Sequence, residues 1–199
     1  MKLPSDLDVP IYIKDEFGDF YRDMFRHQVS RQNGKAVFME YAWNMAWCDP
    51  CAADPLSQSE LRELGVMWLD EPDVRASDIG VGPQPVDVFV TRLHLRYDAK
   101  TFPEDLEFQT TGDRSNFQGR YVLRHAWRGD YGQCAAAGEY ANTLVSRWDN
   151  EASTLAQLTG WELDDITARM ADEGLSAASL GIEEPPKRKW WQNIWSRED

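Results

Sequence analysis

The sequence lacks any run of the roughly 20 apolar residues that a helix needs to cross a bilayer. Its first residues, MKLPSDLDVPIYIKDEF, contain no apolar signal-peptide core. We therefore expect neither a transmembrane segment nor a signal peptide in this chain. Basic residues are also few, since 21 Lys and Arg stand against 34 Asp and Glu, a net charge of −13. Such acidity repels a phosphate backbone and argues against nucleic acid as a partner.

Cysteine is scarce as well, and the three cysteines allow at most one bridge and leave one thiol over. Cysteine usage therefore does not fix the compartment. The 199 residues, 42% of them hydrophobic, suffice for one core. We predict a single domain over residues 1–181, a mobile loop at the acidic, Pro- and Gly-rich residues 70–85, and a basic, Trp-rich tail at 182–199.

Apolar periodicity predicts the secondary structure. Residues 3–13, with two prolines, favour an extended lead-in or edge strand, and helical spacing follows from Phe17 to Val29. Strands are expected at 36–43, 86–97, 106–110 and 117–127. Ser57 and Glu60 form a capping-box pattern for a short helix that Gly65 ends. Short polar turns between successive strands favour an antiparallel meander.

Two helices are expected after residue 133. The first carries an apolar stripe of Cys134, Ala137, Gly138, Ala141, Leu144, Val145 and Trp148. It either continues to Thr159-Gly160 or breaks near Asp149-Asn150. A last helix follows around Leu163, Ile166 and Met170. The element order predicts an α+β fold in which an antiparallel sheet of about four strands packs against several helices.

Cys48 and Cys51 stand in the sequence Trp-Cys-Asp-Pro-Cys, which is similar to a thioredoxin redox motif. There, a helix N-terminus activates the first thiol and the second resolves the mixed disulfide. Here the charge of Asp49 opposes thiolate formation, and Pro55 interrupts the helix that should follow. We favour a structural disulfide or a buried thiol pair, with catalysis by Cys48 and Cys51 as the alternative.

Zinc is a second alternative for the same cysteines, and it would require two further ligands. Cys134 and one histidine could supply them, from the set His27, His94 and His125. A zinc module usually shows a second tight pair of ligands, which this chain does not have. Apart from zinc, we expect no cofactor, because no Ser-His-Asp motif, phosphate loop or H-E-x-x-H motif stands out.

A basic cluster is predicted on two strands that we expect to be adjacent, with Arg92, His94 and Arg96 on one and Arg120 and Arg124 on the other. Arginine binds carboxylates and phosphates in a bidentate manner, so the cluster is a candidate anion site. We favour ion pairing with acidic residues of the sheet, such as Asp105, Glu107 and Asp113, or of the helices.

The tail places Trp190, Trp191 and Trp195 beside three basic residues. Indole rings with basic neighbours suit a membrane interface, a partner's groove or docking onto the domain itself. We favour docking onto the domain or a protein partner over contact with a membrane surface.

Three segments together resemble one bacterial family, domain of unknown function 2330. They are PSDLDVPIYIKDEFGDFYRDMF, EYAWNMAWCDPCAADPLSQSELRELG and TRLHLRYDAKTFPEDLEFQ, in the family's order. The resemblance spans residues 4 to about 123 and concerns the C-terminal half of longer members that carry a signal peptide. It implies an exported or periplasmic ancestry, a setting in which Cys48 and Cys51 could be oxidised.

The resemblance implies no catalytic residues, because the family has no established activity. We interpret the chain as a non-enzymatic binding or structural module related to the cell envelope. The alternatives are a thiol-disulfide oxidoreductase and a zinc-binding module.

Overall fold

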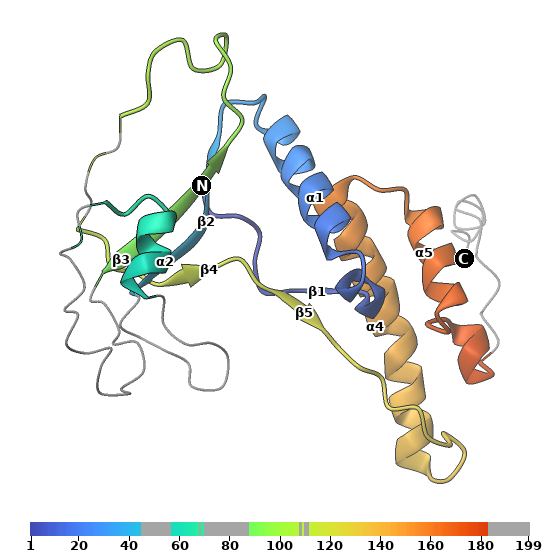
Figure 1. Cartoon of the computed structure of the whole chain (residues 1–199). Helices are drawn as coiled ribbons and strands as arrows, with labels where there is room; N and C mark the ends of the chain where they lie inside the picture. The colour runs from blue at the N-terminus through green and yellow to red at the C-terminus, as the bar shows by residue number, and fades with distance from the viewer. Residues whose placement is uncertain (45–56, 68, 70–87, 108, 110–111, 183–199) are drawn as a thin grey trace, which may run out of the picture. The chain divides into compact units, whose positions relative to one another are not determined.

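A computed structural model describes residues 1–44, 57–67, 69, 88–107, 109 and 112–182 (Figure 1). Contacts divide the chain into two units, one of Met1–Ser5 and Arg31–Arg120 and the other of Asp6–Ser30 and Tyr121–Asp199. The predicted loop at 70–85 and the tail beyond residue 182 lie outside the described residues. The single domain expected over residues 1–181 stays a prediction.

The first unit is built around β2 (Val37–Asn44), which forms the middle of a three-stranded antiparallel sheet. β3 (Phe89–Leu95) pairs along one edge of β2, and β4 (Phe117–Gln118) pairs along the other. The chain's first residues extend that second edge, where the backbone N–H of Leu3 donates to the carbonyl of Met39 over 3.0 Å. The middle position explains why Phe38 and Ala42 of β2 are buried.

β2 carries a bulge at Glu40. Met39 pairs with Leu93 and Tyr41 with Arg92, so Glu40 is the extra residue on its strand. The N–H of Gly119 donates to the carbonyl of Glu40 over 2.9 Å and provides its backbone partner. A bulge re-aims the side chain of the extra residue, and this places the Glu40 carboxylate beside β3.

The short helix α2 (Gln58–Glu63) begins where the sequence predicts. Ser57 Oγ accepts from the backbone N–H of Glu60, and Glu60 Oε2 accepts from the N–H of Ser57 over 2.8 Å, which confirms the capping box. Gly65 ends the turn with φ of +92°. Leu61 and Val66 bury their side chains against the sheet residues Tyr41, Trp43 and Val90.

The second unit contains a two-stranded parallel sheet, β1 (Leu7–Val9) and β5 (Tyr121–Leu123), with Leu7 opposite Tyr121. Such a short pair is marginal alone, so it depends on the helix α4 (Ala135–Thr159), which packs against β1. The 3-10 helix η1 (Ile11–Lys14) and the helix α1 (Phe17–Arg31) follow β1.

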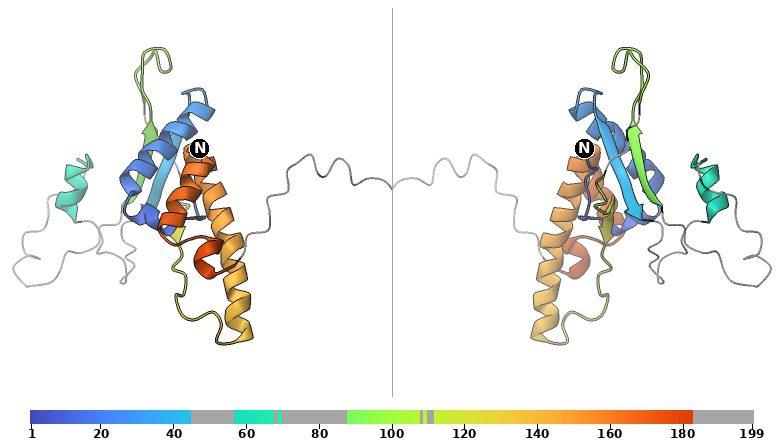
Figure 2. Two further views of the ribbon diagram at one scale, coloured as in Figure 1. Left: turned by 90° about the vertical axis from the view of Figure 1, so that its right-hand side faces the viewer. Right: turned by 90° about the vertical axis from the view of Figure 1, so that its left-hand side faces the viewer.

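α4 is 25 residues long and unbroken, so the apolar stripe continues to Thr159. Its buried side chains recur at helical spacing, among them Leu144, Trp148, Leu155 and Leu158. The helix α5 (Leu163–Asp172) lies alongside α4 and is followed by η2 (Ala177–Leu180) (Figure 2).

Gly160 ends α4 in the left-handed conformation, with φ of +75°. A Cβ at this position would lie 2.6 Å from Nδ1 of His27 on α1, so both the backbone angle and the contact require glycine. Gln28 adds a hydrogen bond from its Nε2 to the carbonyl of Leu158 over 3.3 Å. The end of α4 is therefore fixed against α1.

The α+β fold is confirmed, but several strand predictions are wrong. Residues 11–14 form a 3-10 helix instead of extended chain, and the described residues 106, 107 and 109 are not in a strand. The strand expected at 117–127 is two short strands in different sheets. β3 and β4 flank β2 instead of pairing with each other, so the strands do not form a meander.

Candidate functional site

The clearest charged cluster of the first unit joins β2 and β3. Arg92 and His94 alternate on β3 and so share one face of the sheet, which the bulged Glu40 also reaches. Glu40 Oε2 lies 3.2 Å from Arg92 Nε and 3.6 Å from His94 Nδ1. The Glu40 side chain is only 20% exposed, while that of Arg92 is 64% exposed. One shielded carboxylate thus faces two basic side chains.

This arrangement bears on the predicted anion site. An incoming carboxylate or phosphate would have to compete with Glu40 for the guanidinium of Arg92. It would also approach a carboxylate of its own charge at close range, which is unfavourable. The geometry favours a network of ion pairs within the sheet, and Glu40, which the sequence did not suggest, is a partner of both Arg92 and His94.

The structure distributes the other predicted anion ligands over both units. Arg96 lies just past the end of β3 and is exposed. Arg120 is the last residue of the first unit, and Arg124 belongs to the second. Arg124 Nε donates to Asp8 Oδ1 over 2.7 Å and forms an ion pair there. Anion binding by these residues stays a prediction.

Glu151 on α4 is a site that the sequence reasoning missed. Its side chain is 2% exposed, and its Oε1 lies 3.3 Å from Nε of Arg147, one helical turn earlier. Within the described residues, this oxygen has no donor in hydrogen-bonding geometry. The pKa of Glu151 is raised to about 7, chiefly because the side chain is buried; the charge of Arg147 opposes this shift, that of Asp8 adds to it and that of Arg124 opposes it.

A signal for Glu151 was present in the sequence. The buried positions of α4 include residues 144, 148, 151, 155 and 158, which alternate in steps of three and four. Glu151 therefore occupies a core position of a helix that is otherwise apolar there. Arg147 at i−4 supplies the matching charge. Glu151 is therefore a buried titratable group in the second unit. Its burial favours the neutral carboxyl, so it binds a proton at a higher pH than an exposed glutamate does.

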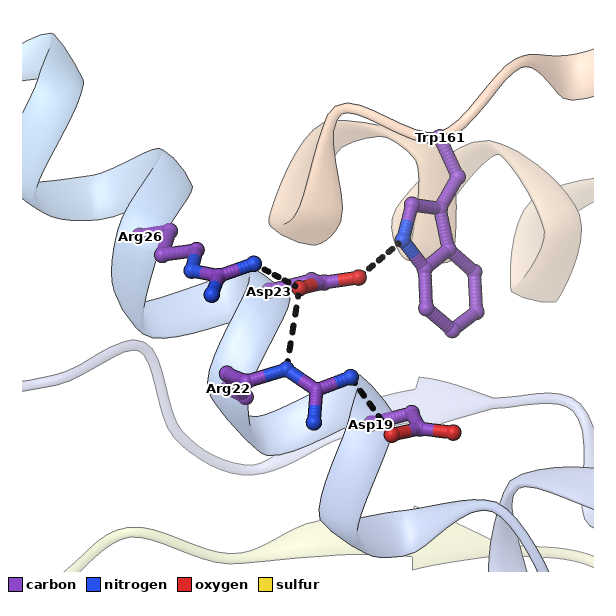
Figure 3. A network of polar contacts seen from close by, with 5 residues as sticks. All are labelled: Asp19, Arg22, Asp23, Arg26 and Trp161. Atoms are coloured by element: carbon purple, nitrogen blue, oxygen red, sulfur yellow. Dashed lines mark hydrogen bonds and ion pairs between the residues drawn. The ribbon is translucent and has the colours of Figure 1, made fainter.

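A second polar network fixes α1 to the residue after Gly160 (Figure 3). The indole Nε1–H of Trp161 donates to Asp23 Oδ2 over 3.0 Å, and Arg26 Nη1 reaches Asp23 Oδ1 at 3.3 Å. Arg22 lies 3.6 Å from Asp23 and 2.5 Å from Asp19. The hydrogen bond to Asp19 is the main reason that the pKa of Arg22 is raised. The network connects α1 to the segment between α4 and α5, so its role is to hold the second unit together.

Cys134 differs from its prediction. It is exposed and forms the N-cap of α4, so it is not part of the buried stripe, because the helix begins only at Ala135. Cys48 and Cys51, which define the predicted disulfide, redox and zinc sites, lie outside the described residues. The same holds for Trp190, Trp191 and Trp195 of the tail.

The histidines proposed as further zinc ligands lie in different settings. His27 packs on Gly160, His94 faces Glu40 and His125 is exposed. Among the described residues, no group of three or more His, Cys, Asp or Glu side chains is placed to hold a metal ion. In the same part of the chain, no helix has the length and apolarity to cross a membrane.

Comparison with known proteins identifies the family. No curated protein and no solved structure matches the chain. Residues 8–109, just over half of the chain, match the family described as uncharacterized protein conserved in bacteria (DUF2330). The match begins within β1 and continues through α1, β2, α2 and β3, and it confirms the resemblance inferred from the sequence. The chain belongs to the DUF2330 family of bacterial proteins.

Proposed function

We propose that this chain is a non-enzymatic binding or structural module of the bacterial cell envelope, held together in part by a structural Cys48–Cys51 pair. The observation that carries the proposal is the internal pairing of its charged clusters. Glu40 faces both Arg92 and His94, and Asp8 faces Arg124. Groups that already satisfy one another are poorly placed to stabilise charge on a substrate, and they are well placed to hold strands together.

The envelope assignment rests on the family. Its longer members carry a signal peptide, according to the resemblance described above, and an exported setting allows disulfides to form and persist. A bridge between Cys48 and Cys51 would close a very short loop in the sequence that follows β2. Cys134, which is exposed, would be the remaining thiol.

Counting thiols and measuring zinc in the same sample tests whether Cys48 and Cys51 form a structural disulfide. Thiols of the purified chain are titrated before and after denaturation, and metal content is measured on the same sample. We expect one reactive thiol in the native protein, no zinc, and a bridge that resists mild reductant. The Cys134→Ala variant is the matched control, because it should remove that single thiol and leave the bridge unchanged.

Two outcomes would contradict the proposal. A bridge that glutathione reduces readily, and that exposes a thiol reactive near neutral pH, would indicate a thiol-disulfide oxidoreductase. Stoichiometric zinc that is lost from the Cys48→Ser variant would indicate a metal-binding module. Fractionation of the full-length gene product in its own bacterium tests the compartment separately, and recovery in the cytosol alone would contradict the envelope assignment.

A further inference from the structure

The loop that leads into α4 exposes an aromatic side chain in a fixed position. Trp127 is 49% exposed, and its indole lies directly on Gly129. A Cβ at Gly129 would lie 1.9 Å from Cζ2 of the indole, so only glycine leaves room for the ring. The half-exposed ring is thus positioned by close contact with the backbone.

Two tyrosine hydroxyls form hydrogen bonds with the backbone of Trp127. The backbone N–H of Trp127 donates to the Tyr140 hydroxyl over 3.1 Å, and the Tyr131 hydroxyl donates to the carbonyl of Trp127. The Tyr131 ring meets the indole edge-on, with ring centroids 5.4 Å apart. A ligand that contacts these rings therefore pays little conformational entropy to order them.

A concavity of about 490 Å³ opens beside this loop. Residues 128–132 form one wall, and Glu173, Gly174, Ser179 and Leu180, which follow α5, form the other. Both walls are braced, because Gly132 N–H donates to Asp130 Oδ1 over 2.8 Å and Ser179 Oγ donates to the Gly174 carbonyl over 2.7 Å. The volume falls within the range of small-molecule sites.

The charges in the concavity restrict its ligand. Arg128, Asp130 and Glu173 line the concavity together, and Glu173 Oε1 is 3.4 Å from Arg169 Nη2 on α5. An apolar ligand would remove water from these charged groups without replacing its hydrogen bonds, which is costly. A phosphate would face two carboxylates, and a simple cation would face Arg128. A neutral ligand with many hydroxyl groups avoids all three penalties.

We propose that this surface is a carbohydrate-binding site. A pyranose ring has one apolar C–H face and an edge of hydroxyl groups. The apolar face suits stacking on the half-exposed Trp127 indole next to the concavity, while Tyr131, which lines the concavity, meets that indole edge-on. Those hydroxyls donate to the carboxylates of Asp130 and Glu173 and accept from Arg128. The assignment goes beyond the proposed function, because it names a ligand class and a surface. It stands whether or not Cys48 and Cys51 form a bridge.

The test measures binding of oligosaccharides to the whole chain by isothermal titration calorimetry. The probes are neutral oligomers of glucose, mannose and N-acetylglucosamine. At least one should bind saturably, and Trp127→Ala should weaken it roughly tenfold, the effect of losing one aromatic contact. Phe17→Ala is the matched control: Phe17 is also 49% exposed but lies on α1, outside the concavity, so its variant should bind as the parent does.

Glu173→Gln provides a second variant, since this exposed side chain can be replaced without disturbing the core. It should weaken the same oligosaccharide several-fold and leave the circular dichroism spectrum unchanged. The proposal is wrong if none of the probes binds, or if binding survives both Trp127→Ala and Glu173→Gln. It is also wrong if Trp127→Ala instead abolishes self-association, which sedimentation would reveal, because the ring would then belong to an interface between copies.

Discussion

Replacing Glu151 with glutamine tests whether the buried carboxylate destabilises the second unit at neutral pH. Glu151 is 2% exposed, and burial raises its pKa from 4.5 to about 7. Each pKa unit corresponds to about 1.4 kcal/mol, so the ionised carboxylate costs the folded state about 3 kcal/mol. Because the folded-state pKa is the higher one, this cost is absent below pH 4.5, grows as the pH rises, and is complete above about pH 7.

The free energy of unfolding of the parent should therefore contain a component that falls by about 3 kcal/mol from about pH 4.5 to about pH 8. Glu151→Gln keeps the size of the side chain but does not titrate, so its curve lacks this component. The substitution also removes the ionic partner of Arg147, which lies 3.3 Å away. Arg147 attracts only the ionised carboxylate, and this attraction is already contained in the pKa of about 7, so the slope of the curve reports the net effect of burial and ion pairing.

Urea denaturation followed by circular dichroism measures both curves. The difference between parent and variant cancels the titration of other groups, including the three histidines. Glu139→Gln removes an exposed carboxylate from the same helix and controls for the loss of one negative charge. If parent and Glu151→Gln differ by a constant amount over the whole pH range, the carboxylate does not titrate as its burial requires, and the reasoning is refuted.

Three further substitutions test local contacts. Gly160→Ala should lower the free energy of unfolding by roughly 1–3 kcal/mol, because Cβ meets His27 and φ is +75°; His27→Ala should recover part of the loss, and no recovery would refute the contact. Ser57→Ala removes the capping box and should increase hydrogen exchange in α2 roughly fivefold, whereas unchanged protection would contradict the cap. Trp161→Phe removes the hydrogen bond to Asp23 and should cost about 1 kcal/mol, an effect that must vanish in an Asp23→Ala background.

Local signals in the sequence predicted the helices well. The Ser57 capping box, the helix over Phe17–Arg31 and the long apolar stripe of α4 all depend on residues within one or two turns of each other. The strands β2 and β3 were also expected near their observed positions. In each case the interaction that specifies the element acts between neighbours in the sequence.

Strand partners could not be predicted in this way. Alternation of apolar residues indicates a strand but does not say which strand lies beside it. Leu7 pairs in parallel with Tyr121, more than half the chain away, and β2 separates β3 from β4. For the same reason the sequence could not show that the five predicted basic residues are divided between the two units. Glu40 was overlooked as the partner of Arg92 and His94, because a bulge that the sequence pattern does not indicate turns its side chain toward β3.

Two features of the second unit break local rules, and both concern α4. Glu151 places a carboxylate at a core position, and the loop before the helix leaves the Trp127 indole half exposed. Each lowers stability relative to an apolar residue at position 151 and a polar one at position 127. Departures of this kind concentrate at functional or strained sites, because selection otherwise removes them. The rest of α4 follows its apolar pattern closely. Glu151 and Trp127 are therefore the two positions of this region where we expect a functional role.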